Sequence, residues 1–138
     1  MDIGIGSPEI CFSGETIKKK MHFVHQDGKN VFKHAVRGMA DVSHEILVKN
    51  SIDPIDIRLY VPHQANLRII QAAVDRMNLD SSRVAINIDR FANTTAATIP
   101  ICISEAAENK SLNKGDLVLL ASFGAGFTWG SLLFSWEM

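Results

Sequence analysis

The sequence predicts an α/β fold: a mixed sheet with helices packed on it, in the order β-α-β-α-β-β. Short apolar runs typical of buried strands alternate with longer segments whose apolar residues recur every three or four positions. The last two strand-like runs are separated only by a short glycine loop, so we expect them to pair antiparallel. Such alternation indicates a mostly parallel sheet covered by helices, with one antiparallel strand added.

The first long helix is expected at 31–47, and Asn30 stands where it could cap the first turn. Asp53-Pro54 breaks this helix, because Asp suits a cap and Pro a first helical position. We expect residues 1–28 to be irregular or short-stranded. The apolar positions that recur at helical spacing are Phe32, Ala35, Val36, Met39, Ala40, Ile46 and Leu47.

The remaining elements follow from the same patterns. The run 57–61 predicts a buried strand that Pro62 ends, 67–77 predicts a second helix, and 84–88 predicts a second strand. A third helix is expected over 99–106. After the turn at 113–116, the apolar run 117–120 predicts a central strand, and 127–134 predicts its antiparallel neighbour.

Composition excludes several classes of function. A length of 138 residues suits one domain, and the net charge of −1 provides no field to attract nucleic acid or an anionic membrane. The basic run 18–20 is expected to be a solvated face. No apolar segment is long enough for a membrane helix, the first residues lack a signal-peptide pattern, and the 2 cysteines show no metal or redox spacing. We therefore expect a cytoplasmic protein.

Two polar side chains stand in strand-to-helix connections. His63 follows a predicted strand and precedes a helix, where unpaired backbone N–H groups disfavour imidazolium. A neutral histidine and the amide of Asn93 can each donate one hydrogen bond. Two donors that converge on a thioester oxygen would stabilise an enolate. From spacing alone, a helix cap or packed histidine and a turn asparagine remain alternatives.

Three motifs carry a resemblance to a known family: Tyr-Val-Pro-His-Gln-Ala-Asn at 60–66, Phe-Ala-Asn-Thr-Thr-Ala-Ala at 91–97, and Phe-Gly-Ala-Gly-Phe-Thr-Trp-Gly at 123–130. They resemble the C-terminal half of a β-ketoacyl-acyl carrier protein synthase III, a condensing enzyme with a thiolase-like fold. The resemblance covers roughly 24–134 and is weak over 1–23. It implies one domain, 1–138, that forms half of this duplicated fold.

The resemblance also implies a role for each matching residue. His63 and Asn93 would be catalytic, and Lys33 and Arg68 would meet the acidic carrier protein. Ala125 replaces a family glycine, which matters only if the position needs a positive φ. The other implied residues are Phe123, Gly124, Ala125 and Gly126 in the gate and oxyanion loop, and Gly28, Phe32, Ala65 and Asn66 along the substrate tunnel.

By resemblance, the reaction is a decarboxylative Claisen condensation of acyl-coenzyme A with malonyl-acyl carrier protein, without cofactor or metal. The family nucleophile is a cysteine in the N-terminal half. Cys11 lies in a region without helical periodicity, and Cys102 lies on an apolar helix face, so neither matches. This chain alone would then be inactive, and it would need the N-terminal half inside a homodimer.

Other interpretations remain open. The chain could be a non-catalytic or partner-dependent module that binds acyl carrier protein, a segment of a longer enzyme, or part of a related polyketide-type synthase. An isolated half of a duplicated fold exposes an apolar face, so we expect self-association. His22 and His25 are expected in an exposed loop.

Overall fold

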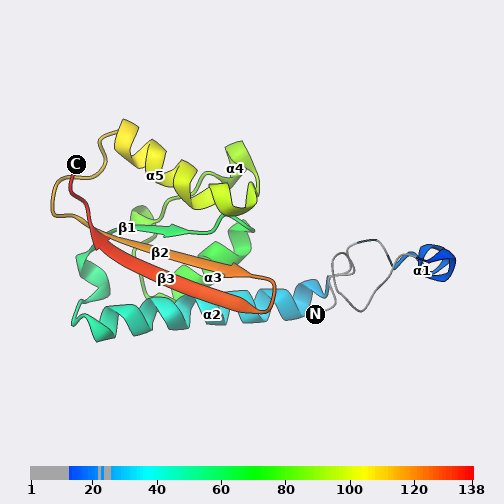
Figure 1. Ribbon diagram of the computed structural model, residues 1–138. Coiled ribbons are helices and arrows are strands. Elements are labelled where there is room, and N and C mark those ends of the chain that lie inside the picture. The colour runs from blue at the N-terminus through cyan, green and yellow to red at the C-terminus, as the bar shows by residue number, and fades with distance from the viewer. Residues whose placement is uncertain (1–12, 22, 24–25) are drawn as a thin grey trace.

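The computed structural model describes residues 13–21, 23 and 26–138. Helices pack on a mixed sheet, as the sequence predicts, but the sheet of the described residues has three strands where the sequence predicted four (Figure 1). The helices are α1 (Gly14–Lys18), α2 (Gly28–Lys49), α3 (Leu67–Met77), α4 (Ile88–Phe91) and α5 (Thr98–Glu108). The strands are β1 (Ile57–Pro62), β2 (Leu117–Gly124) and β3 (Thr128–Ser135), and the 3-10 turns are η1 (Pro54–Asp56), η2 (Ser81–Arg83) and η3 (Thr95–Ala97).

The sheet has the order β1-β2-β3. β1 pairs with β2 in parallel, with Val61 opposite Leu120, and β2 pairs with β3 antiparallel, with Leu120 opposite Leu132. The predicted antiparallel pair around the glycine loop is therefore confirmed. Because the parallel strands β1 and β2 end at the same edge, the loop that follows β1 and the β2–β3 turn meet there.

The two faces of the sheet are covered unequally. Successive residues of β2, such as Val118 and Leu119, point to opposite faces and enter two separate core clusters. The larger cluster joins the sheet to α2 and α3, whereas the smaller one joins it to α5, which contacts β1 (Figure 1).

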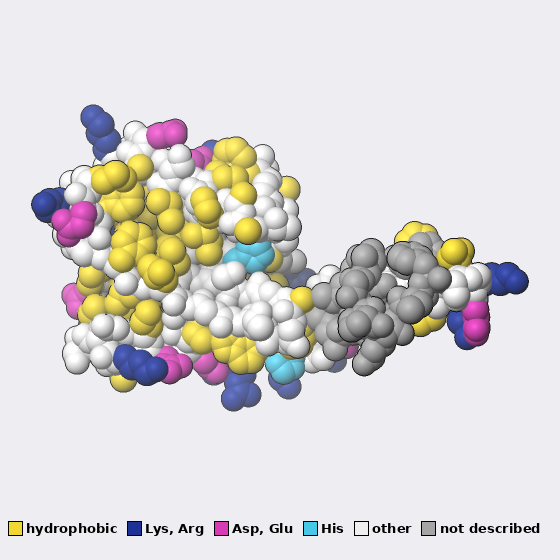
Figure 2. All heavy atoms as spheres, in the orientation of Figure 1, with side chains coloured by type: hydrophobic (Ala, Val, Ile, Leu, Met, Phe, Trp, Pro, Cys, Tyr) yellow, Lys and Arg dark blue, Asp and Glu magenta, His cyan; other side chains and the backbone are white. Residues whose placement is uncertain are grey.

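Part of the second face remains open. Leu132 of β3 is 51% exposed, and hydrophobic side chains gather between α5 and β3 on the surface (Figure 2). We call this patch the open sheet face; its residues are Ile99, Ile103, Leu120, Leu132 and Phe134.

The segment 84–88 does not form the predicted strand. It makes one parallel bridge, between Val84 and Tyr60, and then leaves the sheet to enter α4. The side chain of Gln64 replaces a neighbouring strand: its Nε2 donates to the carbonyl of Ala85 at 3.1 Å and its Oε1 accepts from the N–H of Asn87 at 3.1 Å. The two hydrogen bonds from Gln64 satisfy backbone groups that a neighbouring strand would otherwise pair with, so the segment needs no further strand beside it.

Two expectations near the N-terminal end need correction. Asn30 does not cap α2; Asp27 is the N-cap, and its carboxylate accepts from the N–H of Asn30 at 3.1 Å. Residues 1–28 were expected to lack helix, yet Ser13 caps the short helix α1 through a capping box. The basic run 18–20 is exposed as expected, and Lys19 pairs with Glu15.

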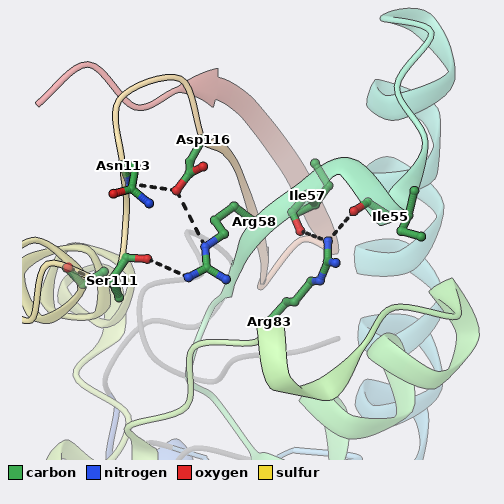
Figure 3. A network of polar contacts seen from close by, with 8 residues as sticks. Ile55, Ile57, Arg58, Arg83, Ser111, Asn113 and Asp116 are labelled. Carbon is green, nitrogen blue, oxygen red and sulfur yellow. Dashed lines mark hydrogen bonds and ion pairs between the residues drawn. The ribbon is translucent and has the colours of Figure 1, made fainter.

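Two arginines hold the start of β1 in place (Figure 3). Arg58 donates to the carbonyl of Ser111 at 3.2 Å and lies 3.7 Å from Asp116, which itself accepts from the N–H of Asn113 at 2.7 Å. Arg83 donates to the carbonyl of Ile57 at 2.8 Å and also to that of Ile55. These bonds join β1 to the loop before β2 and to η2, so the parallel pair that positions the site is anchored at its opposite end.

Candidate functional site

A cavity of about 700 Å³ lies at the edge where β1 and β2 end. Ten of the twelve residues predicted for the site line it, although they come from separate segments of the chain, and Lys33 and Gly126 do not. A second cavity, of about 760 Å³ near Arg76, contains none of them. The lining of the first cavity is Gln26, Gly28, Lys29, Val31, Phe32, Ala35, Met39, His63, Ala65, Asn66, Arg68, Ile69, Asn93, Phe123, Gly124, Ala125 and Phe127.

His63 is held by its backbone and by one side of its ring. Its N–H donates to the carbonyl of Ala121 at 2.8 Å, which continues the parallel pairing beyond β1, and its carbonyl accepts from Ala65 at 2.9 Å. Nδ1 lies 2.6 Å from the Thr98 hydroxyl. No partner for Nε2 is found among the residues that the structure describes.

The pKa of His63 lies below its ordinary value, which confirms the predicted preference for the neutral ring, but the cause differs. Burial of the ring lowers this pKa. The helix that follows begins only at Leu67, with Asn66 as its N-cap, so the helix end lies further along the chain than the sequence interpretation assumed.

Asn93 lies in a strained connection. The residues Ala92 and Thr95 have φ values of 56° and 54°, a conformation that L-residues rarely adopt and that is enriched at functional sites. The Oδ1 atom of Asn93 accepts from the N–H of Thr95 at 3.0 Å. This contact orients the amide so that Nδ2 stays available to donate, as the predicted role of Asn93 requires.

The glycine loop forms the turn between β2 and β3. Ala125 does not have a positive φ, so alanine in place of the family glycine carries no backbone penalty. The glycine requirement falls on Gly126, whose φ is 148° and where a Cβ would lie 2.9 Å from Thr128 Cγ2. The ring centroid of Phe123 lies 5.1 Å from that of Phe127 and 6.5 Å from that of Trp129, whose ring is parallel to it.

All of the predicted tunnel and carrier-protein residues except Lys33 line the cavity. The guanidinium of Arg68 lies 5.7 Å over the ring of Phe32, and both residues line the cavity with Gly28. Asn66 lines it as well, and its side chain accepts from the N–H of Arg68 at 2.9 Å. Lys33 is exposed on α2 and lies outside the cavity lining.

Two residues of the site were missed from the sequence. Gln64 is fully buried beside His63, and Thr98 is 2% exposed under the His63 ring. In the sequence, the polarity of these two side chains was the only indication of a role in the site, and it does not show that the fold buries them. Buried polar side chains are normally hydrogen-bonded, so their contacts became visible only once the chain was folded.

Cys102 is a core residue, as predicted. It is 3% exposed within the smaller core cluster, and burial raises the pKa of its thiol to about 11, so the reactive thiolate is rare. The expectations for Cys11, His22 and His25 concern positions outside the described residues. Across 13–21, 23 and 26–138, no three His, Cys, Asp or Glu side chains form a possible metal site, and no helix has the length and apolarity to cross a membrane.

The site can polarise a carbonyl, but its described lining contains no cysteine that could serve as the thiol nucleophile of acyl transfer. Two neutral donors, His63 and Asn93, border the same cavity, and the described lining contains no cysteine, aspartate or glutamate. Preorganised donors of this kind stabilise negative charge that develops on a substrate oxygen. The geometry therefore suits the stabilisation of an enolate or oxyanion on a bound carbonyl compound.

Comparison with known proteins identifies the same family that the three sequence motifs resemble. Residues 47–136 match the family described as 3-oxoacyl-[acyl-carrier-protein] synthase III C terminal. The chain is 53% identical over 123 residues to β-ketoacyl-[acyl-carrier-protein] synthase III of Chlorobium phaeobacteroides, a match that covers 89% of this chain and 37% of that relative.

Solved structures extend the likeness to three dimensions. The crystal structure of β-ketoacyl-[acyl carrier protein] synthase III from Thermus thermophilus is 47% identical, with a TM-score of 0.80 over 84% of this chain and 36% of that one. The priming β-ketosynthase of the R1128 polyketide biosynthetic pathway is 26% identical, with a TM-score of 0.77 over 89% of this chain and 38% of that one.

Proposed function

This chain belongs to the 3-oxoacyl-[acyl-carrier-protein] synthase III family as its C-terminal part, and we propose that it supplies the decarboxylation site of a complete condensing enzyme. The proposed reaction joins the acyl group of acyl-coenzyme A to malonyl-acyl carrier protein in fatty acid biosynthesis. In it, the cysteine thiolate of the N-terminal part takes the acyl group and releases coenzyme A. The malonyl thioester then loses carbon dioxide, and the resulting enolate carbon attacks the acyl-cysteine carbonyl and displaces the thiolate.

One observation carries this proposal: His63 and Asn93 border the same cavity, and each keeps a donor nitrogen without a protein partner among the described residues. In the proposed mechanism, His63 Nε2 and Asn93 Nδ2 donate to the thioester oxygen of the malonyl group. Negative charge builds on that oxygen as carbon dioxide leaves, so donors already in place lower the barrier.

The other residues have supporting roles in this proposal. The backbone N–H of Ala125 stabilises the oxyanion of the acyl-cysteine, and Phe123, Gly124 and Gly126 shape the loop that presents it. Gly28, Phe32, Ala65 and Asn66 border the path of the pantetheine arm. Arg68, at the cavity rim, and Lys33, on exposed α2, attract the acidic carrier protein, an effect that salt would weaken.

The open sheet face supports the need for a second part. Leu132 and its neighbours form an apolar patch on the half-covered face of the sheet, and this chain spans 37% of the length of the Chlorobium relative. We propose that the N-terminal part packs there and brings its cysteine to the cavity, that the complete enzyme is a homodimer in the cytoplasm, and that it needs no cofactor. Without that part the chain would be inactive.

The test separates the two half-reactions in the complete enzyme. His63→Gln and Asn93→Ala should each slow malonyl decarboxylation about 100- to 1000-fold, the usual loss for one preorganised donor. Transfer of the acyl group to cysteine should change less than about threefold, since neither donor acts in that step. His44→Gln, at an exposed position of α2, is the matched control. Equal loss of both half-reactions would refute this division of labour.

A second candidate function follows from the likeness to the priming β-ketosynthase, which acts in a polyketide pathway. The same donors would serve decarboxylation there, and only the acyl and carrier substrates would differ. Competition between acyl-coenzyme A substrates, with acyl carrier proteins from both pathways, distinguishes the two. A carrier-binding module without turnover is disfavoured, because both donor side chains remain in place around the cavity.

A further inference from the structure

The ring of His63 touches a hydroxyl group to which neither the sequence motifs nor the proposed mechanism gives a role. Thr98, at the first position of α5, lies 35 residues from His63 in sequence, is 2% exposed, and places Oγ1 2.6 Å from Nδ1. A buried hydroxyl at this distance decides which ring nitrogen carries the proton, because a neutral imidazole has one N–H donor and one acceptor nitrogen.

Two arrangements compete for the single hydroxyl hydrogen. Either Thr98 donates to Nδ1 and the ring proton lies on Nε2, or Thr98 donates to the carbonyl of Thr95 at 3.1 Å and Nδ1–H donates to Thr98. The second arrangement would leave Nε2 as an acceptor. An acceptor nitrogen would repel the developing enolate oxygen rather than stabilise it.

Two observations favour the first arrangement. The Nδ1 contact, at 2.6 Å, lies within the short range of O–H donors and below the usual range of N–H donors, and it is shorter than the 3.1 Å contact to Thr95. In addition, the carbonyl of Thr95 already accepts the backbone N–H of Thr98, so it is satisfied without the hydroxyl. The Nδ1 atom has no other donor among the described residues.

We propose that Thr98 is a positioning residue, whose hydroxyl donates to His63 Nδ1 and thereby keeps the ring proton on Nε2, the nitrogen that donates to the substrate oxygen. This inference rests on the proposed function of His63 and deepens it. Thr98 touches no reacting atom; it acts by selecting the tautomer and orientation of the ring, a role that a partner on the second ring nitrogen commonly has.

The first test reads the tautomer directly and needs no Thr98 variant. In the complete protein with ¹⁵N-labelled histidine, the ring nitrogens of His63 are identified by their loss in His63→Gln, and long-range proton–nitrogen spectra show which nitrogen is protonated at neutral pH. A proton on Nε2 supports the inference. A proton on Nδ1 overturns it, whatever the variants do.

The second test measures function with a matched pair. Thr98→Val keeps the shape and removes the hydroxyl, whereas Thr98→Ser keeps the hydroxyl. In Thr98→Val we expect the proton to distribute over both nitrogens and kcat for malonyl decarboxylation to fall about 3- to 10-fold, the usual worth of one hydrogen bond, with KM nearly unchanged. Thr98→Ser should restore both the tautomer and kcat.

The outcomes separate this inference from the proposed function. If His63→Gln slows decarboxylation but Thr98→Val has the tautomer and kcat of the wild type, only the role of Thr98 is overturned. If His63→Gln leaves decarboxylation intact, the proposed function itself fails. A fall in kcat for Thr98→Val that Thr98→Ser does not reverse also overturns the inference, because it points to packing rather than to the hydroxyl.

Discussion

The fully buried side chain of Gln64 holds the N–H of Asn87 at 3.1 Å and thereby ties the loop of His63 to the segment that enters α4. Asn87 continues the connection, since its Nδ2 donates to the Glu105 carboxylate at 2.7 Å on α5. The loop after β1 is thus braced against the helix whose first residue, Thr98, contacts the His63 ring. These polar contacts orient the site from the side opposite the cavity lining of α2 and α3.

Gln64→Leu should destabilise the fold by at least about 3 kcal/mol. The change leaves the N–H of Asn87 and the carbonyls of Pro62 and Ala85 without the partner they have now, and each buried unpaired group costs about 1–3 kcal/mol. Urea unfolding of this chain measures the effect. The control is Gln71→Leu on the exposed side of α3, which should change the free energy of unfolding by less than about 0.5 kcal/mol. Similar losses for both variants would contradict the bracing role.

Gly38→Ala and Gly28→Ala, in the same helix, should have opposite effects on stability. A Cβ at Gly38 would lie 2.9 Å from the Trp129 ring, so we expect a loss of about 1–3 kcal/mol, whereas the space around Gly28 is open and alanine favours the helix by up to about 1 kcal/mol. Thermal unfolding compares the two. The double variant Gly38→Ala with Trp129→Ala should show that the two changes are not additive; strictly additive losses would mean that the contact is unimportant.

Protonation of His63 should weaken the folded state in mild acid. Because the folded-state pKa of His63 lies below the unfolded value of 6.5, the unfolded chain binds more protons between these two values. Stability is therefore full above pH 6.5 and declines as the pH falls toward the folded-state pKa. Urea unfolding of the wild type and of His63→Gln from pH 8 to pH 5 isolates the contribution of His63 to the pH dependence of the free energy of unfolding. We expect a smaller decline in the variant; identical declines would show that His63 does not contribute.

The open sheet face should make this chain self-associate in isolation. Leu132→Asp places a charge in the apolar patch at a position that is 51% exposed, so it should raise the proportion of monomer in sedimentation velocity and weaken association with the N-terminal part. Val48→Asp, at a site on α2 that is 62% exposed, is the matched control and should leave self-association unchanged. A wild-type chain that sediments as a clean monomer would refute the prediction.

The sequence by itself was enough to identify the α/β class, the hairpin around the glycine loop and the three motifs that meet at one cavity. Apolar periodicity and turn chemistry act over a few residues, so they can be read without the fold. Cys102 was also assigned correctly to the core, because a cysteine on an apolar helix face follows the same periodicity.

Only the tertiary structure decided the contacts made by buried polar side chains. The strand expected at 84–88 is replaced by the carboxamide of Gln64, more than 20 residues earlier in the chain, and the His63 ring is met by Thr98, 35 residues away. The neutral state of His63 likewise follows from burial by distant segments rather than from the neighbouring helix end. Hydrogen bonds and desolvation of this kind depend on which distant segments come into contact in the folded chain. Local sequence patterns do not show which segments these are.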